Sequence, residues 1–199
     1  MSRTGMVGAA RPRTTSAMPL DTPHLRSCQA RGMTPVAQRV RFARLAEPAL
    51  DALHELARDP HVRRYLLDGE QVSRAWCDAI LEASDALHDT TGLALYLVER
   101  DGAPIGFAGF HVFDDVSPEP QLLYALLEAH TGCGLATEIA EALVTHAFSL
   151  GRGRVEAAVD APNVASIRVL EKVGFARMER TVPGAFGDTL LFELHSRKR

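Results

Sequence analysis

The sequence predicts a mixed α+β protein, and three observations support this class. Short segments in which apolar and polar residues alternate, as in strands, occur together with segments whose apolar residues repeat every three or four positions, as in helices. The expected order is strand, two helices, three strands, helix, strand, helix and two strands. Because strands and helices do not alternate regularly, this order excludes a doubly wound parallel sheet. The chain of 199 residues is long enough for one sizeable core.

The N-terminal residues differ in composition from the rest of the chain. The first 41 residues carry seven arginines and one acid, Asp21, with many Ser, Thr, Pro and Gly residues and no lasting apolar period. We therefore expect residues 1–37 to be a disordered tail and residues 38–199 to form a single domain. A transit peptide, which is also rich in Arg and Ser and poor in acids, is a less favoured interpretation.

The first half of the domain is predicted to hold one strand and several helices. Residues Val40–Leu45 alternate in polarity, as a half-buried strand does. Pro48 stands in the first turn of a helix that ends before Pro60, because proline is tolerated at a helix start and stops a helix elsewhere. The second helix of the expected order is a longer one with Ser73 as its N-cap, and His61–Leu66, between the two, is compatible with a short additional helix.

From Leu93 the pattern changes to that of strands. Residues 93–100 and 105–113 are expected to pair around an Asp101-Gly102 turn, and residues 121–127 form a third strand apolar enough for the middle of a sheet. The remaining predicted elements are a helix at 135–150, a strand at 154–159, a helix at 164–173 with Gly174 as C-cap, and closing strands at 176–182 and 189–195.

Composition excludes several functional classes. The formal net charge of −3 is unlike the basic surface that nucleic-acid binding needs, and no run of about 18 apolar residues suggests a membrane span. The three cysteines are widely spaced without a CxxC motif, so we expect neither a disulfide framework nor a structural metal site. A cytoplasmic protein is the natural expectation. The oligomeric state stays open, a homodimer included.

A strand, a glycine loop and a helix meet between Leu126 and Glu138. Gly132 and Gly134 allow a ligand to approach the backbone closely, and the helix that follows presents free N–H groups and a positive dipole end. Such a terminus binds phosphate. The Lys of a Walker loop is absent. A glycine turn that only connects strand to helix is the alternative interpretation.

A second motif, Asn163-x-x-Ser166 followed by a helix that ends in Gly174-Phe175, comes after the next strand. Together with Gly132-x-Gly134-x-Ala136-Thr137-Glu138, it closely resembles the signatures of the GNAT N-acetyltransferase superfamily, in particular its ribosomal-protein N-acetyltransferase (RimJ/RimL-type) branch. The resemblance covers about Val40 to His195. It implies a mixed, largely antiparallel sheet flanked by helices, with a splayed parallel strand pair formed by residues 121–127 and 154–159.

The resemblance also implies where acetyl-CoA binds. The cofactor is expected between the splayed strands, with its pantetheine arm beside the backbone of Leu126 and Leu127. Asn163 is expected to bind the cofactor arm or to cap its own helix. The pyrophosphate is expected at Gly132, Cys133, Gly134, Leu135, Ala136 and Thr137. Cys133 replaces a basic residue common in the family, so phosphate binding is expected to depend on the backbone.

Proton transfer is where the sequence departs from the family pattern. Gln121 stands where relatives often carry a glutamate base, and glutamine cannot accept a proton. We therefore expect Glu119, two residues earlier, to order a water as base, with His111 as a second candidate. Ser166 is the implied donor to the leaving thiolate, and Tyr124 is expected to line the pocket or to belong to the core.

The sequence thus predicts an acetyl-CoA-dependent N-acetyltransferase that needs no metal. The acetyl group is expected to move to a primary amine, on a protein N-terminus or a small molecule, by direct attack in a ternary complex. The alternative is a catalytically weak module of the same fold that binds acyl-CoA, since the usual Glu and Tyr positions are lost.

Overall fold

The computed structural model describes residues 34–196, so the predicted tail lies outside the described residues up to position 33. The strands are β1 (Arg41–Arg44), β2 (Leu95–Arg100), β3 (Ala103–His111), β4 (Gln121–Leu126), β5 (Arg154–Asp160), β6 (Ala176–Gly184) and β7 (Gly187–His195). The helices are α1 (Leu50–Arg58), α2 (Pro60–Leu66), α3 (Arg74–Thr91), α4 (Leu135–Ser149) and α5 (Val164–Val173), with 3₁₀ turns at Glu47–Ala49 and Glu128–His130.

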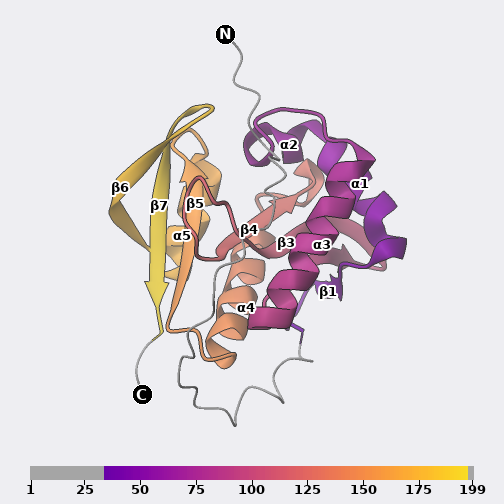
Figure 1. Ribbon diagram of the computed structural model, residues 1–199, viewed down its shortest axis with the longest axis horizontal. Coiled ribbons are helices and arrows are strands. Elements are labelled where there is room, and N and C mark those ends of the chain that lie inside the picture. The colour runs from indigo at the N-terminus through magenta and orange to yellow at the C-terminus, as the bar shows by residue number, and fades with distance from the viewer. Residues whose placement is uncertain (1–33, 197–199) are drawn as a thin grey trace, which may run out of the picture.

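The seven strands form one sheet in the order β1-β2-β3-β4-β5-β7-β6. Every neighbouring pair is antiparallel except β4 and β5, which are parallel. These two strands pair only at Gln121–Glu156 and Leu122–Ala157 and then diverge. Figure 1 shows the result, with β5, β7 and β6 in one half of the molecule and β1–β4 in the other. The predicted mixed, largely antiparallel sheet with a splayed parallel pair is confirmed.

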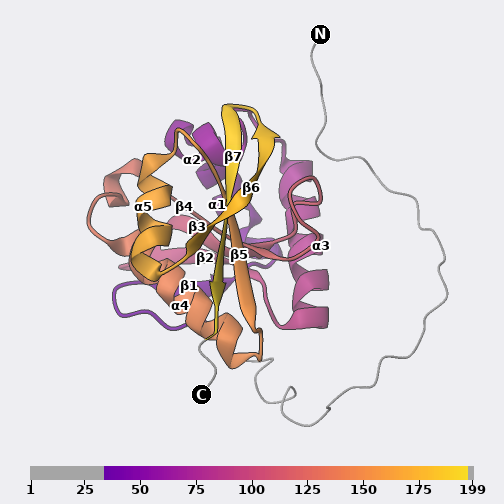
Figure 2. The same cartoon turned by 90° about the vertical axis from the view of Figure 1, so that its left-hand side faces the viewer.

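Helices cover both faces of the sheet and bury two apolar clusters. In Figure 2 the sheet is seen near its edge, with α4 and α5 on one side and α3 on the other. The larger cluster packs α4 and α5 against the sheet and includes Phe110, Ile139, Leu143 and Phe192. The smaller cluster joins α1, α2 and α3 to the opposite face through residues such as Leu53 and Phe107.

Local sequence signals account for most of the element boundaries. The Ser73 side chain accepts a hydrogen bond from the N–H of Trp76 and so caps α3. Gly174 ends α5 in the left-handed conformation at φ +100°. Asp101 and Gly102 both have positive φ in the β2–β3 turn. These three predicted signals are confirmed, and the strand and helix ends lie within a few residues of the expected positions.

None of the helices within residues 34–196 combines the length and apolar character needed to cross a membrane. Within the same residues, no three His, Cys, Asp or Glu side chains gather as ligands for a metal ion.

Candidate active site

A cleft of about 610 Å³ opens where β4 and β5 diverge. This volume is in the range of pockets that hold small molecules. Its walls come from β4, β5, α5, the end of α2, the β3–β4 loop and the β6–β7 hairpin. Of the predicted site residues, the cleft brings together Tyr124, Asn163 and Ser166.

The backbone of β4 presents unpaired polar groups to this opening. Leu127 donates its N–H to the carbonyl of Ile105 on the β3 side. Because hydrogen-bonding direction alternates along an antiparallel ladder, the N–H and C=O of Leu126 and Tyr124 point the other way, toward β5. Pairing with β5 has already ended at Leu122. These groups therefore face the gap and can pair with an extended ligand.

Both backbone groups of Leu127 have partners within the chain. Its N–H is bonded to Ile105, and its carbonyl accepts the N–H of His130 in the turn that follows β4. Its side chain packs in the smaller apolar cluster. Because the strand ends one residue earlier than predicted, the β4 backbone groups left open for a pantetheine arm are those of Tyr124 and Leu126.

The glycine loop has the geometry of an anion site. Gly132 and Gly134 have φ of +73° and +82°, and a Cβ on Gly132 would enter open space. Within the described residues, no hydrogen bond engages the N–H groups of Leu135, Ala136 or Thr137, because the first bond of the helix runs from Glu138 to Gly134. The exposed Cys133 donates its thiol to the carbonyl of His130 at 3.4 Å.

A basic residue that the sequence analysis missed lies beside this loop. The guanidinium of Arg39 donates from Nε to Glu138 Oε2 at 2.5 Å and from Nη1 to the carbonyl of Cys133 at 2.9 Å. Its Nη2 lies 3.5 Å from the place of a Cβ on Gly134, and no hydrogen bond engages this nitrogen within residues 34–196. Arg39 thus brings to the loop the positive charge that Thr131 and Cys133 lack.

The contacts of Arg39 hold Glu138 ionised. Burial by itself would raise the pKa of this carboxyl, but hydrogen bonds from Arg39 and from the N–H of Gln38, with the charge of the guanidinium, lower the pKa below its ordinary value. The chain segment before β1 is thereby fixed to the first turn of α4.

The start of α5 places the remaining predicted groups on the wall of the cleft. Asn163 Oδ1 accepts the N–H of Ser166 at 3.2 Å, which confirms the helix-cap interpretation and leaves the amide nitrogen of Asn163 without a partner in the described chain. Tyr124 donates its hydroxyl to the carbonyl of Ser166 at 3.2 Å, and burial raises the pKa of Tyr124 to about 12. The Ser166 hydroxyl itself has no hydrogen-bond partner in residues 34–196.

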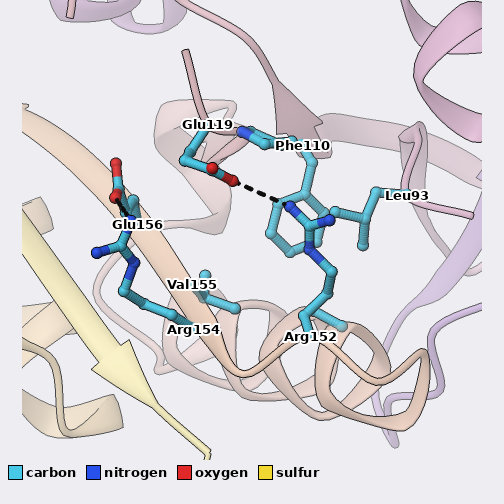
Figure 3. A pocket seen from close by; sticks show the side chains of 9 residues that line it. Leu93, Phe110, Glu119, Arg152, Arg154, Val155 and Glu156 are labelled. Atoms are coloured by element: carbon cyan, nitrogen blue, oxygen red, sulfur yellow. Dashed lines mark hydrogen bonds and ion pairs between the residues drawn. The ribbon is translucent and has the colours of Figure 1, made fainter. Parts of the chain in front are cut away.

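Glu119 does not join these residues. Figure 3 shows its carboxylate directed at Arg152 in a separate, small hollow, with the two groups 3.2 Å apart. Glu156, in the same hollow, pairs with Arg154. Glu119 precedes the first residue of β4 and stands between two prolines, so the strand alternation that was expected to align it with Gln121 does not extend to it.

Gln121 and His111 are neighbours across β3 and β4. Gln121 is 1% exposed and lines the cleft. The ring of His111 packs edge-on against Phe113, another cleft residue, with centroids 4.9 Å apart. Burial lowers the pKa of His111, against the opposing effect of Asp114, so its imidazole is neutral at physiological pH and able to accept a proton.

Comparison with known sequences identifies the class of protein. The sequence profile of the acetyltransferase (GNAT) domain matches residues 39–176, which is more than half of the chain. The protein therefore belongs to the GNAT acetyltransferase family.

Individual relatives agree with this assignment. An uncharacterized N-acetyltransferase, p20, from Bacillus licheniformis is 28% identical over 170 residues, which cover 81% of this chain and 95% of the relative. The ribosomal-protein α-N-acetyltransferase RimL in complex with coenzyme A has a similar fold, with a TM-score of 0.68, 20% identity and coverage of 81% and 96% of the two chains. AAC(6')-Ib in complex with ribostamycin and coenzyme A has a TM-score of 0.65, 22% identity and coverage of 79% and 94%.

Proposed function

We propose that this protein is an acetyl-CoA-dependent N-acetyltransferase whose acceptor is a primary amine. One observation carries the proposal. β4 leaves backbone groups unpaired where it diverges from β5, and the start of α4, one short loop further along the chain, leaves three N–H groups without partners in the described residues. An extended thioester arm that ends in a pyrophosphate needs these two kinds of partner, in a chain of the GNAT family.

The residues present suit such a cofactor. The backbone groups of Tyr124 and Leu126 would pair with the pantetheine amides as an added strand does. The N–H groups of Leu135, Ala136 and Thr137 would bind the pyrophosphate, with Arg39 providing charge. The amide nitrogen of Asn163 is placed on the cleft wall to donate to the cofactor arm.

The bound cofactor supplies an acetyl group activated as a thioester. One of the two N–H groups of β4 that face the gap would polarise the carbonyl and stabilise charge that develops on its oxygen, which leaves the other for the pantetheine arm. The hydroxyl of Ser166, which has no partner in the described chain, donates to the leaving thiolate. Tyr124 helps to fix Ser166, since its own hydroxyl is held by the Ser166 carbonyl.

Removal of the amine proton is assigned to His111 rather than to Glu119. The ring of His111 does not itself line the cleft but contacts a wall residue, Phe113, and its lowered pKa keeps the imidazole neutral, so that a water would carry the proton from the amine to this ring. Glu119 is bound to Arg152 outside the cleft. Gln121 cannot accept a proton, so its position lacks the function that a glutamate would have there.

Both acceptor classes expected from the sequence are represented among proteins of similar fold. RimL is a ribosomal-protein acetyltransferase, and AAC(6')-Ib is an aminoglycoside acetyltransferase. A protein N-terminus and a small-molecule amine therefore both stay as candidate acceptors of the proposed reaction.

The test combines acetyl-CoA titration with measurement of free thiol released in the presence of a panel of amines. The proposal predicts saturable binding and amine-dependent thiol release. Binding without release under any amine would favour the alternative, a catalytically weak acyl-CoA-binding module. As an internal check, Ser166→Ala is expected to lower kcat while acetyl-CoA affinity stays unchanged, whereas Ser149→Ala, at the far end of α4, changes neither.

A further inference from the structure

Three carboxylates line the cleft. Asp68 follows α2, Asp115 lies in the β3–β4 loop, and Asp160 ends β5. None of them forms an ion pair with a Lys, Arg or His of residues 34–196, and in the same part of the chain no basic residue lines the cleft. The carboxylate of Asp160 accepts a hydrogen bond from the hydroxyl of Thr189, at 2.8 Å.

Two guanidinium groups that reach the loops carrying Asp68 and Asp115 bond to backbone oxygens instead. Arg63 donates to the carbonyl of Gly69, and Arg180 donates to the carbonyl of Val116. Each of these carbonyls stands next in sequence to one of the carboxylates, yet neither arginine engages the acid beside it. The three aspartates therefore stay free to bind a cation that enters from solvent.

The carboxylates also interact with one another. The pKa of Asp68 is raised, first by burial and then by the negative charges of Asp160, Asp115 and Glu70. Like charges that repel across an opening favour the binding of a cation between them.

An independent feature of the same cleft points to a ligand that donates hydrogen bonds. The amide nitrogen of Gln121 donates to the carbonyls of Ser117 and Glu119, at 3.0 and 2.8 Å. Because both partners are acceptors, the orientation of the amide is fixed. Gln121 Oε1 is consequently a buried acceptor with no partner among residues 34–196, on a residue that is 1% exposed and lines the cleft.

The cleft thus offers several acceptors, a net negative charge, and apolar surface between them from Leu66, Phe113 and Leu123. An ammonium group has three N–H donors and no acceptor, and a hydrocarbon spacer suits the apolar wall. A neutral amine or a monoamine would leave part of this surface without a partner.

We propose that the acceptor is a small polycationic amine, in which one amino group is acetylated while at least one further ammonium group is held by Asp68, Asp115 and Asp160. This inference rests on the proposed acetyl transfer for the first amine. An aliphatic polyamine and an aminosugar share the required chemistry, and the two sources are separate arms of the test.

The test measures both binding and turnover. Binding of spermidine, kanamycin and butylamine is measured by calorimetry with coenzyme A present, and acetyl transfer to each is measured by thiol release. Spermidine or kanamycin is expected to exceed butylamine in affinity and in kcat/KM by at least about tenfold, with an advantage that falls as salt rises. Asp68→Asn and Asp115→Asn are each expected to weaken the affinity for the polycation about fivefold. Each is expected to change the affinity for butylamine less than about twofold.

Both substitutions are in surface loops, and asparagine suits the positive φ of Asp68, so the variants are expected to fold. Asp101→Asn is the matched control, because it makes the same charge change at another positive φ outside the cleft. Asp101→Asn should leave the affinity and the kcat/KM for every amine unchanged.

The outcomes separate the two proposals. Transfer to amines without preference for polycations, or a preference that both Asn variants retain, overturns the polycation inference and keeps the proposed function. Polycation binding that the Asn variants weaken, without any transfer, supports the inference about the cleft and overturns the proposed reaction. If the protein neither binds nor acetylates any of these amines, both proposals are overturned.

Discussion

Gly134 tests the cofactor loop at the scale of a single residue. Its φ of +82° favours glycine, and a Cβ would lie 3.5 Å from Arg39 Nη2, at the mouth of the anion site. Gly134→Val is expected to weaken acetyl-CoA binding at least tenfold, or about 1.4 kcal/mol, as measured by calorimetry. Gly102→Val is the control, since its φ of +80° brings similar backbone strain in open space far from the loop. Equal acetyl-CoA affinity in both folded variants would exclude this loop as the phosphate site.

Glu119 gives a second prediction at this scale. Because its carboxylate pairs with Arg152 outside the cleft, Glu119→Gln is expected to keep kcat/KM within about threefold of the wild type between pH 6 and 9. Loss of a general base typically lowers the rate by roughly 10²–10⁴-fold. Steady-state kinetics of Glu119→Gln, with Arg152→Gln measured in parallel, gives the change in kcat/KM that separates these two expectations. A drop of that size in Glu119→Gln alone, largest at low pH, would restore Glu119 as the base.

These residues show where reasoning from sequence succeeded and where it failed. The glycine loop and the Asn163 cap were predictable because each depends on residues close together in the chain. Arg39 was missed because its partner Glu138 is 99 positions away. Glu119 was misplaced because side-chain alternation applies only inside a strand, and β4 starts at Gln121.

At the scale of elements, the contact between Arg39 and the first turn of α4 joins the start of the domain to the cofactor loop. In the folded protein the pKa of Glu138 is lowered, so its contribution to stability is present above its ordinary pKa of 4.5 and is lost as pH falls through the lowered value. Glu138→Gln is expected to reduce the free energy of unfolding by about 0.5–1 kcal/mol at pH 7, a small effect because Arg39 is half exposed.

Urea unfolding at pH 7 and at about pH 3 measures this contribution, since most carboxyls are protonated at the lower pH. The difference between wild type and Glu138→Gln should shrink at low pH. Glu141→Gln, an exposed position on the same helix, is the control and should be neutral at both pH values. A difference that stays constant with pH would show that the ionised carboxylate is not the source of the stabilisation.

The elements themselves were largely predictable, because periodicity and capping residues are local. The splayed parallel pairing of β4 and β5 was predicted only through the resemblance to a family. Two strands separated by α4 carry no local signal for where their pairing ends. The acidic lining of the cleft was also beyond sequence reasoning, because Asp68, Asp115 and Asp160 come from three distant segments.

At the scale of the whole molecule, the domain boundary can be tested by truncation. Residues 1–34 lack apolar periodicity, so their deletion is expected to leave the melting temperature and acetyl-CoA affinity unchanged. Deletion of residues 1–39 removes Pro35, which is buried, and Arg39, which binds the first turn of α4. This deletion should lower the melting temperature by at least about 4 °C and weaken acetyl-CoA binding. Equal behaviour of the two truncations in thermal unfolding would contradict the role given to this segment.

Hydrogen exchange of the full-length protein shows directly whether acetyl-CoA lies along the opening between β4 and β5. The N–H groups of Leu126 and Leu135–Thr137 have no intramolecular partner that the structure shows, so they should exchange fast in the free protein. Saturating acetyl-CoA is predicted to slow exchange most strongly in peptides that cover residues 124–137, and far less in α3, which does not line the cleft. Binding of acetyl-CoA with unchanged exchange across residues 124–137 would contradict the account.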